Sequence, residues 1–170
     1  MKSKASQFLL YFVFTAFAGV ALAAGNHPDG SGHGNNNGIG KPGISSMVDR
    51  TVIIDMNEGM HFDPDHLTVN EGETIRFLAE NRDVIEHEFV LGTAEELMEH
   101  SEQMKKFPEM EHENPNQVRV APGQVGEVVW QFTKPGMITF ACLIPGHYEA
   151  GMKGSVSVAT AILKQRAEKR

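Results

Sequence analysis

Short apolar runs separated by turn-forming residues dominate the chain from Thr51 onward. The runs are rich in the β-branched and aromatic residues that are typical of strands. Breakers such as Asn70-Glu71-Gly72 and Ala121-Pro122-Gly123 fall between them. This spacing predicts a β-sandwich of roughly seven or eight strands. The predicted strands are Thr51–Met56, Leu67–Val69, Thr74–Ala79, His87–Leu91, Val118–Val120, Val125–Phe132, Met137–Cys142 and Ser155–Val158.

One segment, Thr93–Lys106, departs from the strand pattern. Thr93 suits the N-cap of a helix, Glu95 and Glu96 would lie in the first turn, and two lysines stand at the end. Acidic residues at the start of a helix and basic residues at its end complement the helix dipole. The segment therefore predicts a helical insertion at one edge of the sandwich.

The first residues predict an export signal. Lys2 and Lys4 precede an apolar run at residues 8–20, and Ala21-Leu22-Ala23 has the small residues of a cleavage site. The alternative is a retained membrane anchor, but the run is short for a spanning helix. We expect a signal peptide at residues 1–23, a flexible Gly/Asn-rich segment at 24–48, one domain at 49–159 and a polar tail at 160–170. Such a protein would be periplasmic, with no stable membrane insertion after cleavage.

Length and charge narrow the class of protein. The chain of 170 residues is long enough for one domain with its own core. Its formal charge of -7 would become -9 on removal of Lys2 and Lys4. This charge argues against nucleic acid as a partner.

Cys142 is the only cysteine, so no internal disulfide can form. An unpaired thiol in an oxidising compartment is open to oxidation unless something occupies it. A bound metal would occupy it, whereas the plain alternative is a buried, inert cysteine. In the preceding strand, Ile138, Phe140 and Cys142 alternate with smaller residues, so the thiol should share their inward face.

The stretch FACLIPGHYEAGMKG, residues 140–154, places His147 and then Met152 at five-residue intervals after Cys142. A proline and two glycines in this loop would turn both side chains back towards the cysteine. A thiolate, an imidazole and a thioether form a soft ligand set that suits copper cycling between Cu(I) and Cu(II). Zinc is the rival metal, but it rarely uses a thioether.

A trigonal Cys-His-His site with a weak axial Met needs a second histidine. His87 is the best candidate, because it begins an apolar strand that a sandwich can bring beside the cysteine strand. The rival histidines are His61, His66 and His112.

In these residues the chain resembles a cupredoxin, a type 1 copper protein, over about residues 51–158. The resemblance rests on CxxxxHxxxxM within GMITFACLIPGH and GMKGSVSV, and on MHFDPDHLTVNEGETIRFLAEN and VRVAPGQVGEVVWQFTKPG. It implies a Greek-key β-sandwich that holds one copper ion. It also implies that His87, Cys142 and His147 are the equatorial ligands and Met152 the axial one. Within the family the chain is most similar to small exported bacterial cupredoxins linked to copper tolerance, which share HEFVLGT, the helical insertion and EHENPN.

One position departs from the family pattern. Many cupredoxins have an asparagine directly after the first ligand histidine, and this chain has Glu88 there. The hydrogen bonds around the thiolate, and with them the reduction potential and colour, therefore do not follow from the resemblance.

The resemblance implies electron transfer rather than catalysis. Copper oxidases and nitrite reductases carry histidines beside the type 1 cysteine, where this chain has Ala141 and Leu143. A closed four-ligand site also leaves no open position for substrate. We therefore expect a monomer that is not an enzyme and that passes electrons through the His147 edge to a redox partner such as a c-type cytochrome.

The alternative function is copper sequestration or delivery to copper-handling proteins. Methionines and histidines in the insertion and in the Gly/Asn segment could capture copper. The plainer expectation is that Leu97 and Met98 pack the helix on the sandwich and that the histidines are solvated. The residues concerned are His27, His33, Met98, His100, Met104, Met110 and His112.

Overall fold

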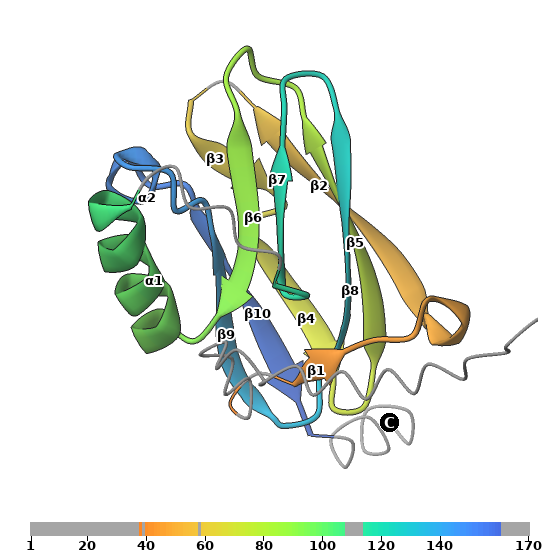
Figure 1. The fold of residues 1–170 in the computed structure, drawn as a ribbon. Coiled ribbons are helices and arrows are strands. Elements are labelled where there is room, and N and C mark those ends of the chain that lie inside the picture. The colour runs from red at the N-terminus through yellow and green to blue at the C-terminus, as the bar shows by residue number, and fades with distance from the viewer. Residues whose placement is uncertain (1–37, 39, 58, 108–113, 161–170) are drawn as a thin grey trace, which may run out of the picture. The chain divides into compact units, whose positions relative to one another are not determined.

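The structure is a computed structural model that describes residues 38, 40–57, 59–107 and 114–160. Within these ranges, ten strands form two five-stranded sheets (Figure 1). The first sheet has the order β1 (Lys41–Pro42), β8 (Val125–Gln131), β5 (Thr74–Asn81), β2 (Arg50–Asn57) and β3 (His61–Asp63). The second has the order β4 (His66–Asn70), β10 (Lys153–Ala159), β9 (Gly136–Ala141), β6 (His87–Gly92) and β7 (Gln117–Val120). The β-sandwich with a helical insertion is confirmed, and all eight predicted strands are present within one or two residues of their expected bounds.

Strands β1 and β3 were not predicted, which raises the number of strands above the expected seven or eight. Strand β3 has three residues, with only Phe62 buried, and one apolar residue between two polar ones is too short an alternation to predict a strand. Strand β1 pairs with β8 and is followed by a short 3-10 helix, Ser45–Met47. Strand β1 and this 3-10 helix both lie in residues 24–48, the segment that was expected to be flexible. The expected signal peptide, residues 1–23, lies outside the described part of the chain, and so does the expected C-terminal tail, residues 160–170, except for its first residue.

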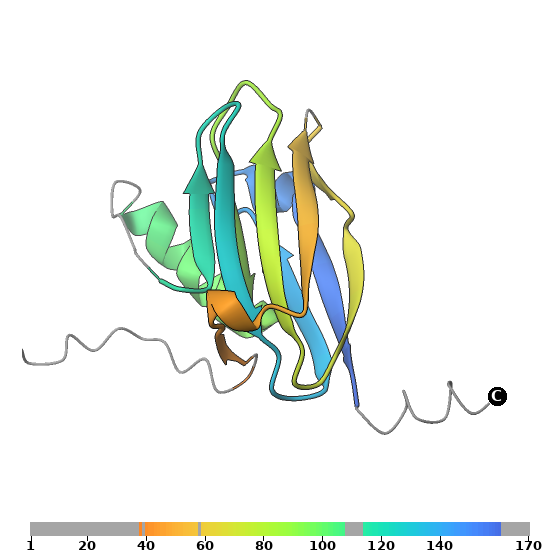
Figure 2. The same ribbon diagram turned by 90° about the vertical axis from the view of Figure 1, so that its right-hand side faces the viewer.

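The hydrophobic core lies between the two sheets. Phe62, Phe77, Phe89 and Phe140 contact one another through edge-on and tilted rings in its centre. Figure 2 shows the first sheet, in which β8, β5 and β2 run side by side over this core. The alternation in β9 holds as predicted, because Ile138, Phe140 and Cys142 are all buried in the same cluster. The thiol therefore stands at the end of a strand whose inner face is packed core.

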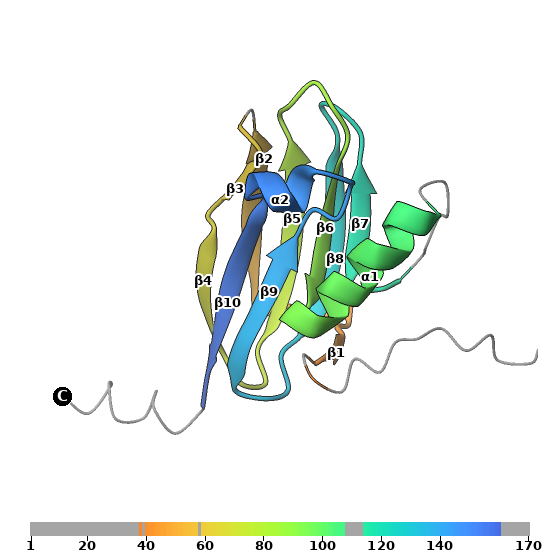
Figure 3. The ribbon, with the colours of Figure 1, turned by 90° about the vertical axis from the view of Figure 1, so that its left-hand side faces the viewer.

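Helix α1 (Ala94–Lys106) covers the outer face of the second sheet beside β6 and β9 (Figure 3). Thr93 is its N-cap, as predicted, and forms a capping box with Glu96. Leu97 is buried against Val90 and Ala141, so β6 is covered on both faces. The expectation for Met98 was wrong, since this side chain is 62% exposed and Met104 is buried instead.

The strand pairing brings two distant segments to one end of the second sheet. Strands β6 and β9 are antiparallel neighbours, with Val90 opposite Ala141. The start of β6 at His87 therefore lies next to the end of β9, where Cys142 follows.

No helix in the described part of the chain is long and apolar enough to span a membrane.

Candidate metal centre

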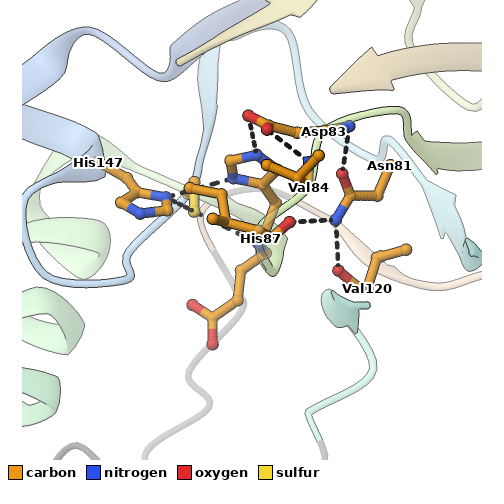
Figure 4. Close-up of polar contacts among 9 residues, drawn as sticks. Asn81, Asp83, Val84, His87, Val120 and His147 are labelled. Carbon is orange, nitrogen blue, oxygen red and sulfur yellow. Dashed lines mark hydrogen bonds and ion pairs between the residues drawn. The ribbon is translucent and has the colours of Figure 1, made fainter. Parts of the chain in front are cut away.

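His87, Cys142 and His147 meet at this end of the sandwich (Figure 4). The Nδ1 atoms of the two histidines are 3.2 Å apart, and Nδ1 of His147 is 3.3 Å from Sγ of Cys142. All three potential ligand atoms lie within 4.8 Å of one another. In the described ranges, no other group of three histidine, cysteine or acidic side chains is arranged to hold a metal ion.

The loop after β9 returns the chain to the cysteine. Gly146, with φ of 93°, precedes the four-residue helix α2 (His147–Ala150), and Gly151, with φ of 109°, ends it. Both glycines adopt the left-handed backbone conformation that other residues rarely tolerate. The N–H of Met152 then donates to the carbonyl of His147 at 3.0 Å, and the N–H of Cys142 donates to the carbonyl of Met152 at 3.1 Å. Met152 is fully buried, and its backbone ties the two ends of the loop together.

Burial favours the uncharged forms of the Cys142 thiol and the His147 imidazole. Burial raises the pKa of the Cys142 thiol to about 12, although the N–H of Glu88 acts in the opposite direction. Burial, and then the neighbouring His87, lower the pKa of His147. A bound cation would replace the thiol proton and accept the free imidazole lone pairs.

The spacing of these atoms fits one metal ion. Two nitrogen ligands at bond lengths of about 2.0–2.1 Å from a single ion stand roughly 3.3–3.6 Å apart at tetrahedral to trigonal angles. The observed 3.2 Å between the imidazole nitrogens is close to this separation. One thiol and two imidazoles, with a buried thioether beside them in sequence and backbone contact, form a donor set suited to copper.

The two rival histidines that the structure describes, His61 and His66, do not join this group. His61 is exposed on β3. His66 is exposed on β4, and its Nδ1 contacts Oγ of Ser155 at 2.9 Å. His87, in contrast, is fully buried. The remaining rival, His112, lies outside the described residues, as do His27, His33 and Met110.

Glu88 keeps one important contact despite its departure from the family pattern. Its backbone N–H donates to Sγ of Cys142 at 3.3 Å, a bond that does not depend on the side chain. The Glu88 carboxylate is buried and accepts two hydrogen bonds from the guanidinium of Arg119, at 2.8 and 3.1 Å. Arg119 lies directly opposite Glu88 in the pairing of β7 with β6. An ion pair thus lies beside the site, at the position where many cupredoxins have an asparagine.

Two residues of the site, Asn81 and Asp83, were missed by the sequence analysis. Asp83 contacts Nε2 of His87 through its carboxylate at 3.2 Å, and Asn81 binds the N–H of Asp83 (Figure 4). The N–H of Val84, helped by His87, holds the pKa of Asp83 below its ordinary value. Asp83 lies four residues before His87, and this spacing was the one available signal.

Comparison with known proteins agrees with this geometry. Residues 48–159 match the family model described as copper binding proteins, plastocyanin/azurin family. The chain belongs to this family. It is therefore a cupredoxin, with copper as its cofactor.

Three curated relatives of this cupredoxin carry the name copper-resistant cuproprotein CopI. The one from Rubrivivax gelatinosus is 47% identical over 93% of this chain and 99% of its own length. The one from Pseudomonas aeruginosa is 33% identical over 71% of this chain and 82% of its own length. The one from Vibrio cholerae is 33% identical over 71% of this chain and 72% of its own length.

Solved structures of auracyanins share the fold of this cupredoxin. Reduced auracyanin from Roseiflexus castenholzii has a TM-score of 0.57 and 24% identity over 66% of this chain and 98% of its own. Auracyanin B has a TM-score of 0.60 and 21% identity over 71% of this chain and 96% of its own. At these identities the likeness supports the β-sandwich alone.

Proposed function

We propose that this cupredoxin is a periplasmic type 1 copper protein that transfers electrons and acts in copper tolerance. In this proposal His87, Cys142 and His147 are the equatorial ligands and Met152 is the axial ligand. The observation that carries it is the meeting of two imidazole nitrogens and the only thiol of the chain within 4.8 Å. The names of the CopI relatives support the link to copper tolerance.

The burial of these side chains favours electron transfer. When bound, copper would supply one-electron chemistry between Cu(II) and Cu(I). The protein holds His87 on a strand and Cys142 at a strand end, both fully buried in packed surroundings. Ligands that the core holds in place move little between the two oxidation states of the metal, and this keeps the reorganisation energy of electron transfer small. Because four donors would surround the ion, no position is left for a substrate.

His147 is the proposed entry and exit point for the electron. This residue is half-buried, whereas the other three proposed ligands are fully buried. Around it, Ile144 is half-buried and Pro145 and Ala150 are exposed, which leaves a small apolar surface. The acidic net charge, -7 for the whole chain and -9 after the proposed removal of Lys2 and Lys4, suits brief encounters with a basic redox partner, such as a c-type cytochrome.

Sequestration or delivery of copper is the second candidate. The exposed thioether of Met98 on α1, together with the names of the relatives, favours it. In this function the protein needs no redox partner, and copper must leave the site at a useful rate. Full burial of three of the four proposed ligands opposes rapid release.

The first test is the optical and EPR spectrum of the copper-loaded mature protein. We expect an intense thiolate-to-copper band in visible light that disappears in Cys142→Ser and is strongly altered in His87→Gln. His66→Gln is the matched control, because it removes a histidine outside the group, and its spectrum should be unchanged. A colourless wild-type protein, or a band that survives Cys142→Ser, would contradict the proposed site.

A second measurement separates the two functions. The rate of electron exchange with a reduced or oxidised c-type cytochrome is measured by stopped-flow mixing, and the rate of copper loss is measured with a Cu(I) chelator. We expect electron exchange to be complete long before the chelator removes the metal. Copper transfer to the chelator that is faster than electron exchange would favour delivery instead.

A further inference from the structure

The loop between β5 and β6 places a carboxylate behind His87. Oδ2 of Asp83 lies 3.2 Å from Nε2 of His87, on the side of the ring opposite to the proposed metal (Figure 4). The side chain of Asp83 is 9% exposed and that of His87 is fully buried, so water hardly competes for this contact. The cupredoxin function does not require such a carboxylate, because any hydrogen-bond acceptor could hold the ring.

This contact determines which nitrogen of His87 carries the proton. A carboxylate only accepts hydrogen bonds, so Nε2 must be the protonated nitrogen of the neutral ring. Nδ1 then presents its lone pair to the space shared with His147 and Cys142. Ionised Asp83 also lends electron density to the ring through the hydrogen bond and makes it a stronger ligand.

Asp83 is itself fixed by a small network. Its other oxygen, Oδ1, accepts from the N–H of Val84 at 2.6 Å, and its own N–H donates to Oδ1 of Asn81 at 2.9 Å. Asn81 is buried, and its amide donates to the carbonyls of Ile85 and Val120, each at 2.8 Å. The network connects the loop to β5 and β7, so the carboxylate cannot swing away without breaking buried bonds.

We propose that Asp83 is a positioning residue whose fixed negative charge, acting through His87, stabilises Cu(II) relative to Cu(I) in this site. The inference rests on the proposed function, because it assumes that His87 binds copper through Nδ1. A negative charge close to the metal lowers the free energy of the more highly charged ion by the greater amount. Loss of such an outer partner typically weakens metal affinity by about 10- to 100-fold.

The test compares Asp83→Asn with Glu86→Gln. The first change keeps the size of the side chain and removes its charge, and the one amide oxygen can accept from Nε2 of His87 or from the N–H of Val84 but not from both. The second is the matched control, since Glu86 is a nearby exposed carboxylate that pairs with Arg119 at 3.5 Å rather than with a proposed ligand. In Asp83→Asn we expect affinity for Cu(II) to fall about tenfold relative to Cu(I), which raises the reduction potential by about 59 mV. Glu86→Gln should change the potential much less.

A potential in Asp83→Asn that shifts no more than in Glu86→Gln would overturn the proposal. If the variant does not fold, NMR of the wild-type protein in its metal-free and Cu(I) forms still decides the matter. We expect His87 to carry a slowly exchanging proton on Nε2, and a proton on Nδ1 instead would refute the role of Asp83. A wild-type protein without the visible thiolate band would contradict the proposed function, which is a separate and distinguishable result.

Discussion

Removal of the Arg119 guanidinium is expected to destabilise the metal-free protein far more than removal of an ordinary surface arginine. The Glu88 carboxylate is only 7% exposed, and its Oε1 accepts both hydrogen bonds from Arg119. Its second oxygen, Oε2, has no hydrogen-bond partner among the described residues. Arg119→Ala would therefore leave a buried charge without its partner.

The magnitude follows from the burial of the two side chains. Breaking a buried ion pair by removing one partner costs about 3–5 kcal/mol. Arg119 is 38% exposed, so water can partly replace it, and the loss should be about 2–3 kcal/mol. The double variant Glu88→Gln/Arg119→Ala should recover at least about 1 kcal/mol, because it no longer buries a charge.

The assay is urea unfolding of the metal-free variants. The matched control is Arg82→Ala, since Arg82 also forms two ion pairs, with Asp55 and Glu80 at 2.9 Å, but is 60% exposed. Arg82→Ala should lower the unfolding free energy by less than about 1 kcal/mol. The reasoning is refuted if Arg119→Ala loses no more unfolding free energy than Arg82→Ala, or if the double variant recovers nothing.

Three further predictions concern the Cys142 thiol, strand β10 and helix α1. Burial raises the pKa of the folded Cys142 thiol to about 12, so the unfolded chain loses the thiol proton at a lower pH than the folded protein does. Above about pH 9, the unfolding free energy of the metal-free protein should therefore fall by up to about 1.4 kcal/mol per pH unit more than that of Cys142→Ser. Urea unfolding at a series of pH values measures this difference. Gly154→Ala would place a methyl group against the ring of Phe140, so calorimetry should show a loss of about 1–3 kcal/mol, and an unchanged melting temperature would contradict the packing. Thr93→Ala removes the capping box with Glu96 and should cost about 1 kcal/mol in urea unfolding, whereas a neutral result would mean that the cap contributes nothing.

Local patterns were sufficient for most of the fold and part of the site. Alternation along β9 predicted that Cys142 faces the core, and the N-cap Thr93 together with the two lysines at the end of the segment predicted the bounds of α1. The burial of Met104 rather than Met98 was also available in principle. Met104 follows Leu97 by seven residues, two helical turns, and therefore shares its face.

The polar contacts around His87 could not be predicted from the sequence, because they depend on how loops and strands meet. Glu88 and Arg119 are 31 residues apart, and only the register of β6 with β7 makes them neighbours. The contact of Asp83 with His87 needs a loop conformation that Asn81 fixes from β5. Resemblance identified His87 among the histidines of the chain, and the pairing of β6 with β9 explains its place beside the thiol.

Three of the four proposed ligands lie within residues 142–152 and need no distant strand to stay near one another. A chain that has lost its sandwich still carries a thiol, an imidazole and a thioether in one short segment, which copper can gather at a small entropic cost. Metal that also binds the unfolded chain protects the native state less than its affinity implies. The extra protection that copper gives the folded protein should therefore depend chiefly on His87, the ligand that only the assembled sheet supplies.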